Sequence, residues 1–127
     1  MLVFVCVCVP SRELLTADRT PKLTDRDAGV LARALQHCPR VQELLLVRNN
    51  VGDDGATALA HSLPRLQALR GLWLNDNGVG DDGATALARS LSHLAALQQL
   101  NLNNNSVGAD GAVAVRKAAR GGCLVSV

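Results

Sequence analysis

Residues 49–63, NNVGDDGATALAHSL, recur almost unchanged as residues 77–91, NGVGDDGATALARSL. The two copies differ only at their second position and at His61 versus Arg89. The same offset, 28 residues from 49 to 77, relates leucines and asparagines on either side: Leu44, Leu72 and Leu100; Leu46, Leu74 and Leu102; Asn49, Asn77 and Asn105. Self-similarity at a fixed period of this length indicates an array of stacked structural units.

Each unit contains the pattern L-x-x-L-x-L-x-x-N, as in residues 69–77. Leu72 and Leu74 alternate in the way that one face of a short strand requires. Asn77 then ends the strand, and its side-chain amide can bond the backbone of the turn and of a stacked neighbour. We therefore predict a structural role for this asparagine and for its counterparts Asn49 and Asn105.

A turn and a helix are predicted after each strand. Gly52 and Gly80 suit the turn. Apolar residues at i, i+3, i+4 and i+7 form one helical face in each copy: Ala56, Leu59, Ala60 and Leu63, then Ala84, Leu87, Ala88 and Leu91. A carboxylate is expected at each helix N-cap, either Asp53 or Asp54 in one copy and either Asp81 or Asp82 in the other. Because this acidic pair recurs in a cap position, we interpret it as structural and not as a pair of catalytic acids.

A 28-residue unit of the form LxxLxLxxNxVGDDGAxALAxxL resembles the ribonuclease-inhibitor-like class of leucine-rich repeats. It is similar to the repeats of NOD-like receptors and of the Ran GTPase-activating protein. The resemblance covers residues 23–124. It implies an α/β fold, a right-handed solenoid shaped as a short horseshoe, with parallel strands on the concave face and helices on the convex face. The class includes inhibitors, immune sensors, GTPase activators and cytoskeletal scaffolds, so it implies binding without naming a partner.

The N-terminal part departs from the repeat. We divide the chain into residues 1–22, an apolar segment with a degraded or shifted first repeat or cap, and residues 23–127, the repeats proper. At the fixed offset, Thr16 and Asp18 stand where the strand leucines belong, and Pro21 replaces the asparagine. Residues 1–9, MLVFVCVCV, favour a buried strand because β-branched valines alternate there. A signal-peptide core or the ragged start of a larger protein's fragment are the alternatives, although no Lys or Arg precedes the stretch and no small-x-small site follows.

The C-terminal part predicts a terminal unit. Arg116 stands where the earlier helices have alanine, which suits a polar end face. Arg116, Lys117 and Arg120 are interpreted as cations at a helix C-terminus. The next strand is expected to begin after Val125. Because an open strand edge can pair with another copy, we predict a weakly stable monomer or an edge-mediated dimer.

Composition excludes several classes of protein. Of 127 residues, 48% are hydrophobic and 19% charged, which is enough for a core and too little charge for a disordered chain. The net charge of +2 and two aromatic residues, Phe4 and Trp73, argue against nucleic-acid binding. No apolar run has the length of a transmembrane helix, so no membrane partner is predicted. Cys6, Cys8, Cys38 and Cys123 lack the paired spacing of a zinc site and are interpreted as reduced, which favours the cytoplasm over secretion.

Function is expected on the concave face, at the residues between the leucines. Trp73, the only tryptophan, lies between Leu72 and Leu74 and so faces away from the core. It is either a binding anchor or packs against neighbouring segments. The charged residues among them can steer a polar partner or form a solvated face. The predicted partner-binding residues are Glu43, Leu45, Arg48, Arg70, Trp73, Asn75, Asp76, Asn101 and Asn103.

The predicted function is a non-enzymatic protein–protein interaction module that binds a protein partner on the concave face. The resemblance adds two alternatives, a regulator of a small GTPase and a ligand-sensing repeat fragment of a NOD-like receptor. No catalytic residue, metal or cofactor is predicted. His37, His61 and His93 do not converge with the candidate serines Ser62, Ser90 and Ser92, which lack a nucleophile-elbow motif.

Overall fold

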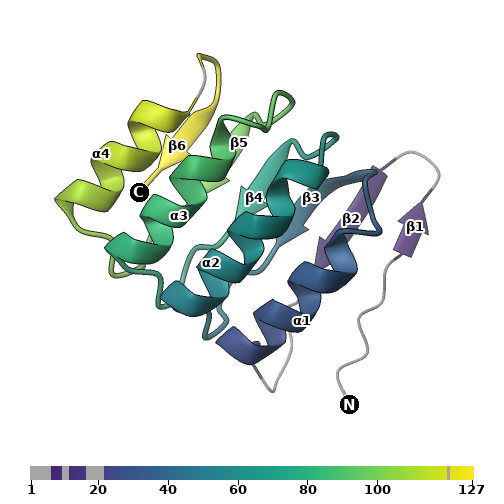
Figure 1. The fold of residues 1–127 in the computed structure, drawn as a ribbon, viewed down its shortest axis with the longest axis horizontal. Helices are drawn as coiled ribbons and strands as arrows, with labels where there is room; N and C mark the ends of the chain where they lie inside the picture. Colours follow the sequence, from purple (N-terminus) through teal and green to yellow (C-terminus); the bar gives the residue numbers. More distant parts are fainter. Residues whose placement is uncertain (1–6, 10–11, 17–21, 120) are drawn as a thin grey trace.

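The computed structural model describes residues 7–9, 12–16, 22–119 and 121–127 (Figure 1). Strands and helices alternate along most of this chain. In chain order the elements are β1 (Val7–Val9), β2 (Arg12–Thr16), α1 (Asp25–Leu35), β3 (Val41–Leu45), α2 (Asp53–Ser62), the 3-10 turn η1 (Leu63–Arg65), β4 (Gly71–Trp73), α3 (Asp81–Leu91), β5 (Gln99–Asn101), α4 (Ala109–Ala118) and β6 (Leu124–Ser126).

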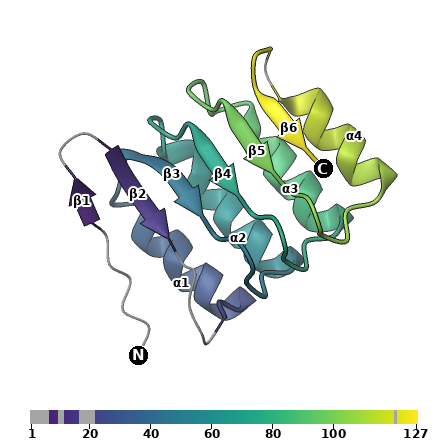
Figure 2. The same ribbon diagram turned by 180° about the vertical axis from the view of Figure 1, so that it is seen from behind.

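The strands of the described residues form one sheet in the order β1-β2-β3-β4-β5-β6. β1 and β2 are antiparallel, and every later pair of neighbours is parallel. The helices α1 to α4 lie side by side over one face of the sheet, and none of them covers the other face (Figures 1 and 2). We call the uncovered side the strand face. The predicted architecture of parallel strands backed by helices is confirmed.

The core lies between the sheet and the helices. Leu44, Leu72 and Leu100 stand opposite one another on β3, β4 and β5, and each is at most 1% exposed. The predicted helical faces are buried against them. Ala56, Leu59, Ala60 and Leu63 and then Ala84, Leu87, Ala88 and Leu91 all belong to this core. A period of 28 therefore places each apolar residue beside its own counterpart.

Asparagines join neighbouring repeats at the ends of the strands, as predicted. The Asn77 Nδ2 donates to the carbonyls of Leu46, in the preceding repeat, at 2.8 Å and of Leu74, in its own, at 3.0 Å. Its Oδ1 accepts from the Val51 N–H of the preceding repeat at 3.0 Å. Asn105 repeats this arrangement one unit later. Each asparagine therefore supplies partners to buried backbone groups that water does not reach.

The predicted aspartate N-caps are wrong. The N-cap residues are Gly52 for α2 and Gly80 for α3, and neither helix has a side-chain cap at that residue. Instead, the Asp53 Oδ1 at the start of α2 accepts from the N–H groups of Gly80 at 2.7 Å and Gly83 at 2.8 Å. Asp25 does the same for α2, and Asp81 for α4. Each aspartate thus satisfies the orphan donors of the next helix in the stack.

This contact explains the glycine in the first turn of each later helix. A Cβ at Gly83 would lie 2.6 Å from the Asp53 Oδ1 and 3.0 Å from the Ala56 Cβ. The corresponding position in α1 is Asp27, and no earlier helix of the described residues packs there. Asp27 instead forms a capping box with Thr24, which lowers the pKa of the Asp27 carboxyl. The first helix is therefore capped by its own sequence and the later helices by their neighbours.

The N-terminal strand is shifted by one residue from the fixed offset. Leu15, and not Thr16, stands opposite Leu44, and the register is irregular between Glu13 and Leu14. This shift places Leu15 in the row of strand leucines that contains Leu44. A strand kept at the fixed offset would have Thr16 there, and its alternation of apolar and polar residues would be reversed. The strand predicted within residues 1–9 is confirmed for β1 only, since residues 1–6 lie outside the described part. Asp18 and Pro21 lie outside it as well.

The C-terminal strand begins earlier than predicted. β6 starts at Leu124, and its Val125 pairs with Leu100 at an offset of 25 residues instead of 28. The expectation that a strand begins after Val125 is therefore wrong. The connection between α4 and β6 is short, so the last strand reaches the sheet before a fixed period would place it. Leu124 consequently lies beside Gln99 on the strand face.

Candidate functional site

The strand face presents the residues between the core leucines, as predicted. Glu43, Gly71 and Gln99 align across β3, β4 and β5. Leu45, Trp73 and Asn101 form the next row. All of them except Gly71 are partly or fully exposed, whereas the intervening leucines are buried. The alternation of residues along the strands therefore predicted correctly which side chains face away from the core.

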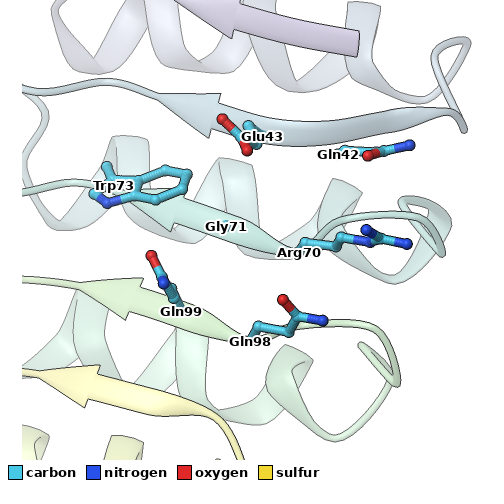
Figure 3. Close-up of a pocket in the computed structure, with 7 residues that line it drawn as sticks. All are labelled: Gln42, Glu43, Arg70, Gly71, Trp73, Gln98 and Gln99. Atoms are coloured by element: carbon cyan, nitrogen blue, oxygen red, sulfur yellow. The ribbon is translucent and has the colours of Figure 1, made fainter. Parts of the chain in front are cut away.

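A shallow depression of about 220 Å³ lies in the strand face (Figure 3). It brings together three of the predicted residues, Glu43, Arg70 and Trp73. Its lining is completed by Gln42, Gly71, Gln98 and Gln99, none of which was among the predicted binding residues. Gln98, which precedes β5, and Gln99, in β5, each carry both hydrogen-bond donors and acceptors. The depression therefore combines one aromatic ring, one cation, one carboxylate and several amides.

Trp73 lies across the backbone of its own strand. A Cβ at Gly71 would stand 2.0 Å from the Cη2 and 2.1 Å from the Cζ3 of the indole ring. Gly71 is therefore required for this position of the ring, and Trp73 remains half-buried. Figure 3 shows the ring beside Glu43 and above the strand that carries Gly71. A glycine within a strand, between Glu43 and Gln99, is the sequence signal of such a close approach.

The remaining predicted residues lie at the ends of the strands. Arg48 and Asp76 occupy the same turn position in successive repeats as Asn104, which was not among the predicted binding residues, with φ of 56°, 58° and 55°. Asparagine and aspartate tolerate this left-handed conformation well, and arginine tolerates it less well. Asn103 is exposed, and its N–H donates to the Asn101 Oδ1 at 3.0 Å. These residues form a second group along the strand face.

Asp76 is the centre of a polar cluster in this second group. Its Oδ1 accepts from the Asn104 Nδ2 at 2.9 Å, and its Oδ2 accepts from the Asn75 Nδ2 at 2.8 Å. These two hydrogen bonds lower the pKa of the Asp76 carboxyl, and the charge of Arg48 lowers it further. The Asn75 Oδ1 is buried without a hydrogen-bond partner among the described residues.

Replacing Asn104 with glycine is expected to raise the pKa of Asp76 toward its ordinary value, because it removes the hydrogen bond that lowers this pKa most. Glycine suits the left-handed backbone at this position. The stabilisation that comes from the lowered pKa is present above the unfolded-state pKa and is lost as pH falls through the folded-state pKa. Carbon-13 NMR titration of the Asp76 carboxyl in both proteins measures the difference. Identical titration curves would contradict the proposed hydrogen bond.

One exposed apolar residue of the strand face was missed. Leu124 on β6 is 69% exposed and pairs with Gln99. The fixed offset placed the next strand too late, so no sequence signal marked this residue as outward-facing. Leu124 therefore adds an exposed apolar side chain beside Gln99, on the last strand of the sheet.

Two of the candidate serines, Ser62 and Ser90, form hydrogen bonds within their own helices. The hydroxyls of Ser62 and Ser90 are buried and donate to the carbonyls of Leu59 and Leu87, each at 2.8 Å. Cys38 and Cys123 are free thiols, and burial raises the pKa of Cys123. Within residues 22–119 and 121–127, no group of three His, Cys, Asp or Glu side chains is arranged to hold a metal ion. No described helix is both long and apolar enough to cross a membrane.

Comparisons with known proteins agree with this architecture. The family described as Leucine Rich repeat matches residues 37–60, 67–88 and 93–115, which together make up more than half of the chain. A search of curated proteins found no match. Among the solved structures that match is one named "Leiomodin-1 Actin-Binding Site 2 (ABS2)", with a TM-score of 0.78 and 20% identity, covering 89% of this chain and 68% of that chain. At that identity the likeness shows the fold alone. The chain belongs to the leucine-rich repeat family.

Proposed function

We propose that this chain binds a protein partner on its strand face, with Trp73 and the depression beside it as the principal contact. Leucine-rich repeats are generally protein-interaction modules. The observation that carries the proposal is the half-exposed indole that lies over Gly71, with the exposed Arg70 at the other end of the same depression (Figure 3). Tryptophan and arginine are the residue types that contribute most to binding energy at protein interfaces.

The shape of the depression favours a protein surface over a small molecule. Small-molecule sites usually enclose roughly 300–1,000 Å³ and have mainly apolar walls. This depression measures about 220 Å³, is open, and is lined largely by glutamine, glutamate and arginine side chains. A side chain or loop of a partner can enter it and bond the amides while the indole contributes apolar contact. The paired strands beneath order the backbone of these residues before binding, which reduces the entropy cost.

The 28-residue period and the VGDDGA sequence support placing the repeats in the ribonuclease-inhibitor-like class. The free thiols of Cys38 and Cys123 support a reducing compartment such as the cytoplasm. The matching leiomodin structure is named as an actin-binding site, so actin is the first defined partner to test. No contact described above favours a GTPase regulator or a receptor fragment.

The proposal is tested by titrating the purified chain with actin, and with any protein captured from a lysate by the wild-type chain. Trp73→Ala is expected to raise the Kd about 30-fold, since truncating an interface anchor costs about 2 kcal/mol. Leu45→Glu combined with Trp73→Glu should abolish binding. Gly71→Ala keeps the indole but displaces it from its place over the strand, so it should also weaken binding.

Val30→Glu is the matched control, because Val30 is an exposed apolar residue on α1, in the layer of helices behind the sheet. It should leave the Kd unchanged. Circular dichroism spectra must agree for all variants. A partner that binds the Trp73 variants as tightly as the wild type would place the site elsewhere and overturn the proposal.

A further inference from the structure

One side of β6 has no neighbouring strand within the described residues. The Leu124 N–H donates to the Gln98 carbonyl at 2.8 Å, and the Ser126 carbonyl accepts from the Leu102 N–H at 2.7 Å. Residues alternate in the direction of their backbone groups along a strand, so the N–H and C=O of Val125 point away from β5. This edge is therefore a template for a further strand.

Exposed apolar side chains lie on both sides of this edge. Leu124 is 69% exposed on the strand face, and Val113 of α4 is 61% exposed in the helix layer. In the earlier repeats the position of Val113 is held by Thr57 and Thr85, which are partly buried. The apolar residue thus occurs in the outermost helix, where no described helix covers it. One occupant placed against this end would bury both side chains.

A further helix of the same repeat would lack its cap at this end. Asp25, Asp53 and Asp81 each cap the following helix. The corresponding residue of α4 is Ala109, which has no side-chain oxygen to accept from backbone N–H groups. The end face formed by α4 and β6 is therefore suited to a different occupant from the repeats that precede it.

The charges of α4 are complementary to those of a second α4 that runs in the opposite direction. Asp110 lies in the first turn of α4, and Arg116 and Lys117 lie in its last turn. Arg116 also donates to the Val127 carbonyl at 3.1 Å, which holds the end of β6 against the helix. A two-fold axis beside Val113 brings Asp110 of each copy level with the two cations of the other. Antiparallel helices also align their dipoles favourably.

We propose that a second copy of this chain binds at the edge of β6, so that the two sheets continue across a two-fold axis. Val125 exchanges both backbone hydrogen bonds with Val125 of the second copy, as opposed residues do in an antiparallel pair. Leu124 then stands opposite Ser126 of the second copy on the strand face. The two α4 helices pack antiparallel through Val113, and Asp110 pairs with Lys117. The interface is isologous and closes at a dimer.

Val125→Pro tests the strand pairing. Proline removes the outward N–H of Val125 and breaks no hydrogen bond to β5. Sedimentation velocity over a range of concentrations should show the 13.3 kDa chain in equilibrium with a species of twice its mass. The variant should raise the dimer dissociation constant at least tenfold, with unchanged circular dichroism and Trp73 fluorescence. A wild-type chain that stays monomeric up to about millimolar concentration would overturn the proposal, even if another protein binds the edge.

A charge exchange tests the direction of the helices and does not alter β6. Lys117→Glu should weaken the dimer, and adding Asp110→Lys to that variant should restore it, because the pair is re-formed with its signs reversed. Arg33→Glu is the matched control, since Arg33 lies in the last turn of α1 at the other end of the helix layer. It should leave the dissociation constant unchanged. A double variant no tighter than Lys117→Glu alone would exclude the antiparallel packing of α4.

Discussion

Replacing Asn77 with alanine is expected to lower the free energy of unfolding by about 3 kcal/mol, a large part of the stability of a small domain. The substitution removes the acceptor of the Val51 N–H, the donor to the Leu46 carbonyl and one of the two side-chain donors to the Leu74 carbonyl. These three residues are fully buried. A buried backbone group left without a partner costs about 1–3 kcal/mol. Urea unfolding followed by circular dichroism measures the loss.

Asn103→Ala is the matched control for this prediction. Asn103 lies in the turn after β5, within the following repeat, and its side chain is exposed. Its replacement is expected to change the unfolding free energy by less than about 0.5 kcal/mol, as for most surface substitutions. Equal losses in the two variants would show that the asparagine bonds between repeats contribute little to stability.

Replacing Asp53 with alanine should cost about 2 kcal/mol. Its Oδ1 accepts from the N–H groups of Gly80 and Gly83, and no other acceptor of the described residues is bonded to them. Charge-assisted bonds of this kind are stronger than those between neutral groups. Asp53→Asn keeps an acceptor oxygen but removes the charge, so its loss should be intermediate. Thermal or denaturant unfolding of the three proteins orders them.

Asp54 provides an internal control, because it neighbours Asp53 in the same first turn but is exposed and caps no helix. Asp54→Ala removes only a charge near the helix N-terminus, which is worth at most about 1 kcal/mol. A loss as large as that of Asp53→Ala would mean that the effect comes from the helix dipole and not from the hydrogen bonds to the next helix.

The buried interior of the repeat and the asparagine bonds between repeats could be predicted from the sequence, but the partners of the aspartates could not. Leu72 and Ala56 were assigned correctly because their environment repeats with the sequence. Asp53 was assigned to the wrong helix because local capping rules consider only neighbouring residues. Its partners lie 27 and 30 residues further along the chain. A rule based on proximity in sequence cannot find a contact that stacking creates.

The ends of the array show a second limit of a fixed period. Leu15 stands opposite Leu44 at an offset of 29, and Val125 stands opposite Leu100 at an offset of 25. The irregular register between β2 and β3 accounts for the first difference, and the short connection between α4 and β6 accounts for the second. Neither can be detected by comparing residues at a constant spacing. The outward position of Leu124 followed from the second of them and was therefore missed.

For the candidate site, alternation predicted which residues face outward but not how they lie. Trp73 points away from the leucines, as expected, yet its ring folds back over Gly71. The bond between Asp76 and Asn104 joins turns 28 residues apart. Side-chain rotamers and contacts between turns depend on the assembled surface, so the sequence predicted the list of outward residues better than their arrangement.

The hydrogen bonds between repeats run in opposite directions through the stack. The aspartates serve the helix that follows, and the asparagines serve the turn that precedes. If an inner repeat opened by itself, polar groups of the repeats on both sides would therefore lose their hydrogen-bond partners. Partly opened forms are penalised twice, so intermediates with a single open repeat stay sparsely populated. A chain whose contacts are nearly one-dimensional can in this way keep the all-or-none unfolding of a globular domain.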